Sequence, residues 1–297
     1  MVRNNKLSSL LWHPHQGLWN WALLGAIRKI VPLSPIYIPI FTLIAYLDSA
    51  ILFLRALLRR VSQVGFTKIF SKVRIPDDAS ILYLDLGTHK EGNELALMVE
   101  RILPRLCKKF ESYGFEASRE SFDQVKAKFA NKKNVDLINK ALCYVLPPEG
   151  KIKLFKDIKR EGVGDSLYKP TEHYEKIEAM RLSDWLRESN IDLQNRICLL
   201  RMNIEGSEYD VIKDLVERGL AKHIDGYYGM WDDVSKIDKK RGEEFLAYLE
   251  ENKIYNFTFN IRDMEWPVRI RCIEYDIGTS VQAGLNRIKR RVEGKRK

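Results

Sequence analysis

The sequence has few cysteines and lacks the paired cysteines on which zinc sites and disulfide frameworks depend. Its four cysteines are widely spaced and form no CxxC pair, so neither kind of site is indicated. Each lies in an apolar or strand-like context, which is typical of small buried side chains in a reducing compartment; they are Cys107, Cys143, Cys198 and Cys272. We also expect no cleavable signal, because the first long apolar run starts too far into the chain and no small-residue cleavage site follows it.

The formal net charge of +10 is concentrated at the two ends of the chain. Residues 1–80 contain 10 Lys and Arg against 3 Asp and Glu, residues 285–297 contain 7 against 1, and the remainder contains 33 against 36. A nucleic-acid enzyme more often carries its basic charge around the active site. Basic termini on a mildly acidic body fit anionic lipid headgroups or phosphates at least as well, and a solvated tail without a partner is an equal alternative for 285–297.

Residues 31–54 form an apolar run of 24 residues with one charged side chain, Asp48. This length reaches the ~20 residues that a helix needs to span a bilayer core. Three prolines crowd its first half, where they would break or kink a helix. In the rest of the run, Asp48 lies near the middle, and inserting such a charge into a bilayer costs about 2.5–3.5 kcal/mol. The preceding residues, 18–30, are amphipathic with tryptophans suited to a membrane interface. A spanning helix, a hairpin on or in the membrane, and a soluble helical cap stay open; we expect a cytoplasmic protein associated with the membrane through residues 18–60.

Strand and helix patterns alternate from about residue 80 onward. We predict strands at 81–87, 111–117, 135–144, 197–205 and 224–231, with helices at 93–108, 118–130, 207–219 and 236–252. An insertion holds extended segments at 151–157 and 173–180 and a short helix at 181–189. Such alternation predicts a mostly parallel sheet with helices on both faces. Two closing segments without a helix between them, 255–261 and 268–277, predict a hairpin and hence one antiparallel edge strand.

The chain thus divides into an apolar and basic helical segment (1–75), an α/β domain (76–284) and a basic tail (285–297). In a sheet of this kind, ligands bind outside the carboxyl ends of the strands, where the strand order reverses. The residues that follow each strand are therefore the candidate site residues.

The first strand ends in "DLGTHKEGNE", which contains Asp85, Gly87, His89 and Gly92. Glycines let the chain turn tightly and approach a ligand closely. An acid at a strand end is able to accept hydrogen bonds from a donor such as an ammonium group. The stretch does not match the nicotinamide fingerprint G-x-G-x-x-G, and an ordinary strand-to-helix turn is the alternative.

The next three strand ends add an acid, an apolar pair and a second polar turn. Glu116 ends the second strand about 30 residues after Asp85, in the place of an acid that binds the two ribose hydroxyls of a nucleoside. Ala141 and Leu142 are apolar enough to flank a purine. The fourth strand ends in "RMNIEGSEYDVI", which sets an amide, Asn203, and two carboxylates around a glycine.

Four stretches, "YLDLGTHKEGNEL", "YGFEASRESF", "INKALCY…GKIKLF" and "LLRMNIEGSEYDVI", resemble in order the segments of FkbM-type methyltransferases. The stretch "KIEAMRLSDWL" also resembles the family's segment before the fourth strand, and the resemblance covers roughly residues 80–235. It implies an α/β, Rossmann-like class I fold with a mostly parallel seven-stranded sheet, to which this chain adds its N-terminal apolar helical segment. It also implies S-adenosylmethionine as cofactor and, for many members, O-methylation of a sugar or polyketide hydroxyl.

The resemblance implies roles for individual residues. Asp85, Gly87 and Gly92 match the loop that holds the methionine part of the cofactor, and Glu116 matches the ribose-binding acid. The loop is one residue longer than the commoner D-x-G-x-N-x-G, with His89 where asparagine is usual. This departure bears on how the loop meets the sulfonium or the substrate.

The fourth stretch matches the family's D-x-E-G-x-E segment, but Asn203 stands where the family has its aspartate. The other matching residues are Glu205, Gly206 and Glu208. An amide at this position argues against a catalytic metal held there, so we expect no metal site.

Methyl transfer to a hydroxyl is an in-line displacement in which positioning supplies much of the acceleration and a general base assists. Candidate bases are His89, whose unperturbed pKa suits the task, Glu205, Glu208 and Asp232. His89 reads equally as a surface-loop residue, and Glu208 as an acid that complements the helix dipole. We assign catalysis to Glu205, His89 and Asn203.

Two residues after the fifth strand are candidate acceptor contacts. Trp231 is able to stack on a sugar face or to belong to the core, and Asp232 follows it. Ser166 lies in a glycine-containing loop over 160–170, as a lid residue or an ordinary loop residue.

The leading hypothesis is an S-adenosylmethionine-dependent O-methyltransferase that acts on a glycan or lipid-linked saccharide near a membrane. The pI of about 9.3 suggests a nucleic-acid methyltransferase as the alternative, but no N-P-P-Y-like or Pro-Cys motif occurs, so nucleic acid is not an expected partner. A membrane-tethered scaffold that keeps the fold without catalysis is the third hypothesis.

Overall fold

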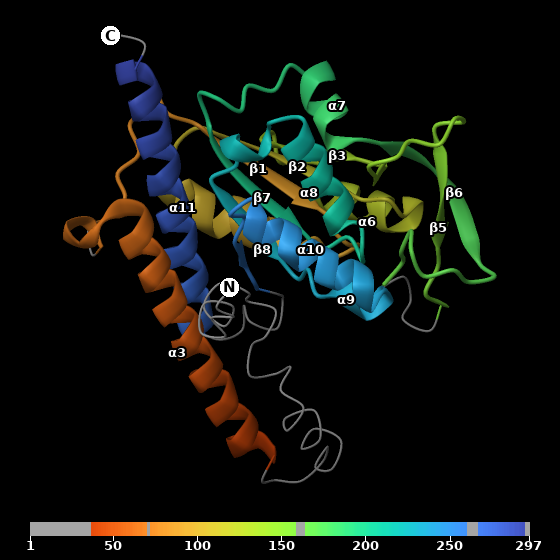
Figure 1. Ribbon diagram of the computed structural model, residues 1–297, viewed down its shortest axis with the longest axis horizontal. Helices are drawn as coiled ribbons and strands as arrows, with labels where there is room; N and C mark the ends of the chain where they lie inside the picture. Colours follow the sequence, from red (N-terminus) through yellow and green to blue (C-terminus); the bar gives the residue numbers. More distant parts are fainter. Residues whose placement is uncertain (1–36, 70–71, 159–163, 260–266, 295–297) are drawn as a thin grey trace, which may run out of the picture.

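The apolar segments of the sequence form a central parallel sheet. The computed structural model describes residues 37–69, 72–158, 164–259 and 267–294. Within them six strands pair in the order β3-β2-β1-β7-β8-β9, and every pair is parallel (Figure 1). The strands are β1 (Ile81–Leu86), β2 (Phe110–Phe115), β3 (Val135–Ile138), β7 (Ile197–Met202), β8 (Gly226–Gly229) and β9 (Asn256–Phe257).

Both faces of this sheet are buried, and successive side chains alternate between them. In β1, Ile81 and Tyr83 belong to one hydrophobic cluster, whereas Leu82 and Leu84 belong to the other. All six residues of β1 and all six of β7 are buried. Parallel strands that are covered on both faces read as continuous apolar runs, which is why the mostly parallel sheet could be predicted.

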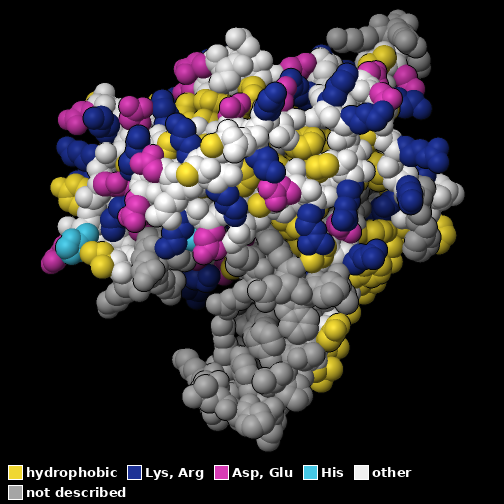
Figure 2. Space-filling model, turned by 180° about the vertical axis from the view of Figure 1, so that it is seen from behind, with side chains coloured by type: hydrophobic (Ala, Val, Ile, Leu, Met, Phe, Trp, Pro, Cys, Tyr) yellow, Lys and Arg dark blue, Asp and Glu magenta, His cyan; other side chains and the backbone are white. Residues whose placement is uncertain are grey.

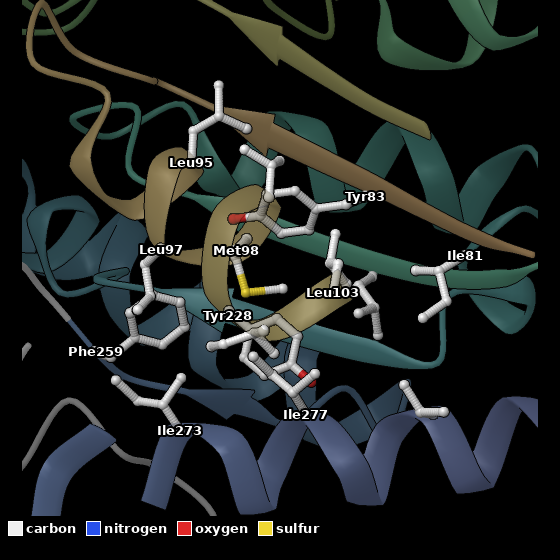
Figure 3. Close-up of a cluster of buried hydrophobic side chains, with 14 of the residues drawn as sticks. Ile81, Tyr83, Leu95, Leu97, Met98, Leu103, Tyr228, Phe259, Ile273 and Ile277 are labelled. Atoms are coloured by element: carbon white, nitrogen blue, oxygen red, sulfur yellow. The ribbon is translucent and has the colours of Figure 1, made fainter. Parts of the chain in front are cut away.

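Helices cover the two faces. One face carries α7 (Leu182–Glu188), α8 (Glu208–Glu217) and α10 (Lys239–Glu251). The other carries α6 (Arg119–Phe129), α11 (Pro267–Gly294) and one continuous stretch made of α4 (Asn93–Ala96), the π-helical η3 (Leu97–Ile102) and α5 (Leu103–Leu106). Figure 3 shows Met98 of η3 and Ile277 of α11 packed near Tyr83 and Tyr228. The short helices are η2 (Phe66–Lys68), η5 (Ala221–His223) and α9 (Asp233–Ile237).

Residues 268–277 belong to helix α11 and do not form the predicted strand. The sheet has six strands rather than seven among the described residues, and the predicted hairpin with an antiparallel strand over 268–277 is wrong. The buried side chains here are Arg269, Cys272, Ile273, Asp276 and Ile277, whose spacing follows the helical period. Residues 285–294 of the predicted basic tail continue the same helix.

A long helix, α3 (Tyr37–Val64), packs along α11 at the edge of the domain (Figure 1). Leu52 and Ala56 join the same hydrophobic cluster as α11. Arg59 Nη1 donates to both carboxylate oxygens of Asp276 at 3.0 and 3.2 Å. The predicted amphipathic stretch 18–30 and the first part of the apolar run lie outside the described residues. Among the residues that are described, no helix is both long enough and apolar enough to cross a membrane.

The insertion after β3 forms a second sheet, in the order β4-β6-β5. Its strands are β4 (Ala141–Leu142), β5 (Lys151–Phe155) and β6 (Tyr174–Met180). The predicted strand 135–144 is thus two strands in two sheets. Between them, Asn139 Nδ2 donates to the backbone carbonyls of Glu116 and Ala117, which ties the start of the second sheet to the end of β2.

Candidate active site

A cavity of about 720 Å³ lies at the carboxyl edge of the main sheet. Four strand ends contribute to its lining: Gly87 after β1, Glu116 after β2, Asn203 after β7 and Met230 after β8. The second sheet adds a wall through its strands β4 and β5. The strand order reverses between β1 and β7, so this is the expected ligand position in such a sheet, and the volume is within the range of small-molecule sites.

Asp85, the acid at the end of β1, is fully buried and is not among the residues that line the cavity. Its Oδ1 accepts a 2.7 Å hydrogen bond from Arg201 Nη1. Arg201 Nη2 lies 3.6 Å from a carboxylate oxygen of Glu94, and both Arg201 and Glu94 line the cavity. Burial raises the pKa of Asp85 to about 6, against the opposing effect of Arg201. This cluster therefore borders the cavity through Arg201 and Glu94, and Arg201 was not singled out in the sequence.

The two glycines of the first loop are required by packing. Gly87 has φ +83°, and a Cβ there would lie 2.1 Å from the Asn203 carbonyl oxygen. Gly92 has φ +53°, and a Cβ there would lie 2.8 Å from side-chain atoms of Val125 and Phe129 on α6. Gly87 lines the cavity and Gly92 does not. The glycines thus let the loop pack closely against β7 and α6, whereas the sequence suggested that they let the loop approach a ligand closely.

Glu116 lines the cavity and holds the neighbouring loops in place. Its Oε2 accepts the backbone N–H of His89 at 2.8 Å, and its Oε1 accepts that of Ser118 at 3.0 Å. Burial raises the pKa of Glu116 to about 7, although both N–H bonds favour the charged form. A carboxylate oxygen has two lone pairs, so each oxygen keeps one with which to accept a hydrogen bond from a ligand hydroxyl.

His89 also lines the cavity, in a left-handed conformation with φ +61°. Its Nδ1 accepts the Glu91 N–H at 3.4 Å, and its Nε2 is buried without a hydrogen-bond partner. Burial lowers the pKa of His89, so the imidazole is neutral at neutral pH. An accepting Nδ1 favours the tautomer with the proton on Nε2, and Nε2 then offers a hydrogen-bond donor rather than a base.

The apolar wall of the cavity comes from β4 and the end of β2. Ala141 and Leu142, the residues that we predict to flank a purine, both line it, and so does Phe115 at the end of β2. Leu142 and Phe115 belong to the same hydrophobic cluster, which fixes this wall to the core.

The turn after β7 carries the predicted catalytic pair Asn203 and Glu205, and both line the cavity. Glu205 has φ +50°, a left-handed conformation that a non-glycine residue adopts at a free-energy cost of order 1–3 kcal/mol. Burial first, and then the charge of Asp233, raise the pKa of Glu205. Its Oε2 accepts a 2.9 Å hydrogen bond from Lys169 Nζ, and its carbonyl accepts one from Ser166 Oγ at 2.6 Å.

Glu208 has the structural role that was its alternative. It is fully buried, and its two oxygens accept the backbone N–H groups of Ile204 and Gly206 at 2.8 Å each. It therefore holds the turn that presents Glu205. Ser166 is buried against this turn and also lines the cavity.

The two predicted acceptor contacts do not line the cavity. Trp231 is 2 % exposed and belongs to a hydrophobic cluster, which is the core position given as its alternative. Asp232 forms an ion pair with Lys236 at 2.6 Å. The next residue, Asp233, does line the cavity, as does Lys236, which Asp233 contacts at 3.0 Å. The two acids in "MWDD" indicated an acidic residue at this strand end, but the sequence does not tell which of the two lines the cavity.

Among the described residues, no three His, Cys, Asp or Glu side chains are grouped so that they could hold a metal ion.

A parallel sheet with this strand order, an acid at the second strand end and a cavity at the reversal point define a Rossmann-like domain. Residues 85–251, more than half of the chain, match the methyltransferase FkbM domain, and the chain therefore belongs to the FkbM methyltransferase family. The protein is thus a methyltransferase, and S-adenosylmethionine dependence is typical of its family. A comparison with the curated proteins gives no match.

Proposed function

We propose that this protein is an S-adenosylmethionine-dependent O-methyltransferase whose acceptor is a saccharide hydroxyl. The observation that carries the proposal is the lining of the cavity, which joins a nucleoside-type half to a polar half. Glu116, Ala141 and Leu142 form the first half, and Glu205 and Asp233 form the second.

The residues present fit the cofactor. Glu116 would accept the ribose hydroxyls, and the apolar wall of Ala141 and Leu142 would lie against the purine. His89 lines the cavity and its buried Nε2 has no hydrogen-bond partner, so this nitrogen would donate to a ligand acceptor. When bound, S-adenosylmethionine supplies a methyl group that is already activated on a sulfonium.

Glu205 is the residue that we assign as general base. The hydroxyl proton of the acceptor passes to its carboxylate as the oxygen takes the methyl group, and Lys169 keeps the side chain in place through Oε2. A raised pKa makes this carboxylate a better proton acceptor at neutral pH than an ordinary glutamate. His89 is less suited, because its hydrogen bonding favours a proton on Nε2.

The charge of the cavity supports a neutral, hydroxyl-rich acceptor over a nucleic acid. Polyanion binding sites are rich in Lys and Arg, whereas acids outnumber them here. The acidic lining residues are Glu91, Glu94, Glu116, Asp165, Glu205 and Asp233, and the basic ones are Lys140, Arg201 and Lys236. Carboxylates that alternate with lysines offer the acceptors and donors that sugar hydroxyls need.

Calorimetry with S-adenosylmethionine and mass spectrometry of cellular glycans test the two parts of the proposal. We expect the full chain to bind the cofactor, and cells with the protein to gain one methyl group on a glycan that cells without it lack. Glu205→Gln should keep cofactor binding and lose the methylated glycan. Glu243→Gln, an exposed acid on α10, is the matched control that should keep both. No cofactor binding by the wild type would overturn the proposal, and a methylated non-glycan product would overturn its acceptor.

A further inference from the structure

Helix α3 presents an apolar face to the outside of the molecule. Every exposed side chain described between Leu43 and Leu58 is apolar, with Leu43 60 % and Leu54 52 % exposed. These residues recur at helical spacing on the side opposite Leu52 and Ala56, which are buried against α11. Figure 2 shows hydrophobic side chains gathered along this helix, at the lower right. The outer apolar face consists of Leu43, Tyr46, Leu47, Ala50, Ile51, Phe53, Leu54 and Leu58.

The arginines described in the same part of the helix point the other way. Arg55, Arg59 and Arg60 are all less than 9 % exposed. Arg59 forms the buried ion pair with Asp276 of α11, and Arg60 donates to the Lys68 carbonyl. A helix on the surface of a water-soluble domain normally turns its charges outward and its apolar stripe inward, so α3 has the reverse arrangement. An apolar patch of this kind marks a surface that contacts another apolar phase.

The composition of the outer face favours lipid over a protein partner. Protein interfaces carry about one hydrogen bond per 100–200 Å² and a polar rim, but the outer face offers one side-chain polar group, the Tyr46 hydroxyl, along roughly 22 Å of helix at 1.5 Å per residue. After the end of the helix, Phe66 adds another apolar side chain that is 75 % exposed. Two exposed cations, Lys72 and Arg74, follow it. Of the 10 Lys and Arg in residues 1–80, three are the buried Arg55, Arg59 and Arg60, and the other seven outnumber the 3 Asp and Glu, which complements anionic headgroups.

We propose that the outer apolar face of α3 lies on the surface of a bilayer that contains anionic lipid. The apolar side chains enter the boundary between headgroups and acyl chains, and the cations at the end of the helix contact the lipid phosphates. This inference goes beyond the methyltransferase function and does not depend on it. It places the enzyme where a lipid-linked acceptor would be found.

Flotation of the full chain with vesicles tests the proposal. We expect the protein to float with phosphatidylcholine vesicles that contain phosphatidylglycerol, and to float less with pure phosphatidylcholine or at high salt. Leu47→Glu/Leu54→Glu should abolish flotation while the melting temperature stays unchanged, because both side chains are about half exposed. The matched control is Val145→Glu/Ile158→Glu, which changes two exposed apolar residues outside α3 and should float as the wild type does.

Three results would overturn the proposal. One is that the wild type does not float with anionic vesicles. Another is that the α3 variant floats as well as the wild type, which would mean that residues outside this face, such as the tryptophan-containing stretch 18–30, bind the lipid. Alternatively, sedimentation without lipid shows a dimer that the α3 variant abolishes, in which case the face binds a second copy of the chain. Equal flotation with neutral and anionic vesicles would overturn the role of anionic lipid.

Discussion

Arg201 of β7 pairs in register with Asp85 of β1, and its Nη1 donates a 2.7 Å hydrogen bond to the Asp85 carboxylate. The same nitrogen donates to the Gly87 carbonyl at 2.9 Å. The ion pair therefore fixes the start of the loop after β1 against β7, directly behind the cavity. Desolvation offsets much of the attraction in a buried ion pair, but removal of one partner leaves the other charge buried without compensation.

We expect Arg201→Met to lower the free energy of unfolding by about 3–5 kcal/mol, because the Asp85 carboxylate then stays buried without its partner. Burial already raises the pKa of Asp85 to about 6. Loss of Arg201 raises it further, so the variant should regain stability as the pH falls through this raised pKa toward the unfolded value. Urea denaturation at about pH 7 and about pH 5 measures both effects. Asp85→Asn/Arg201→Met, which removes both charges of the 2.7 Å ion pair, should recover most of the loss. An equal loss in both variants contradicts the ion-pair explanation.

The contact between the first loop and β7 predicts a large effect of Gly87→Ala. A left-handed conformation costs roughly 1–2 kcal/mol for a residue with a Cβ, and here the Cβ would also lie 2.1 Å from the Asn203 carbonyl oxygen. Gly150→Ala is the matched control, since Gly150 has φ +66° but no atom within 4 Å of the added Cβ. Thermal unfolding should show Gly87→Ala less stable than Gly150→Ala by about 1–3 kcal/mol. Equal stabilities would mean that the loop moves away from β7 without cost.

The sequence was most informative where a parallel sheet imposes the geometry. The carboxyl ends of parallel strands meet at one edge, so His89, Glu116, Asn203 and Glu205 were expected together, and all four line the cavity. Arg201 was missed although it left a signal. It is the single charge in "ICLLRM", as Asp85 is in "ILYLDL", each at the fifth of six positions. Opposite charges at equivalent positions of two buried strands indicate an ion pair.

The end of the domain was not predictable from a short window. In "VRIRCIEYDI" the apolar residues alternate with charged ones, which is typical of a strand. The longer pattern, in which Ile273, Ile277 and Val281 are buried four residues apart along one helix, shows the helical period clearly. The choice between neighbours such as Asp232 and Asp233 depends on how α9 begins after β8, which local sequence does not determine.

The raised pKa of Glu116 predicts that cofactor affinity depends on pH. Its charged form is the better acceptor for ribose hydroxyls, and its pKa in the protein is about 7. We therefore expect the Kd for S-adenosylmethionine to rise as the pH falls through about 7, toward a tenfold weakening per pH unit when the carboxyl is mostly protonated. Calorimetry between about pH 6 and about pH 8 measures this dependence. Glu116→Gln should bind S-adenosylmethionine weakly at every pH. If this variant keeps the wild-type pH dependence of the Kd, a group other than Glu116 causes it.

The bond between Glu208 and the turn before α8 links stability to catalysis. Glu208→Ala leaves the N–H groups of Ile204 and Gly206 without their acceptors, at about 1–3 kcal/mol each if they stay buried. The kcat of the variant should also fall, because the turn presents Glu205. Its Kd for S-adenosylmethionine should stay near that of the wild type, because residues at the ends of β1, β2 and β4 supply that half of the cavity. Glu217→Ala, at the exposed end of the same helix, is the control and should change stability by no more than about 0.5 kcal/mol. Parallel urea denaturation, calorimetry and turnover measurements separate these effects. If Glu208→Ala weakened cofactor binding as much as turnover, the turn would serve the whole cavity, and the assignment of Glu205 to the acceptor half would be wrong.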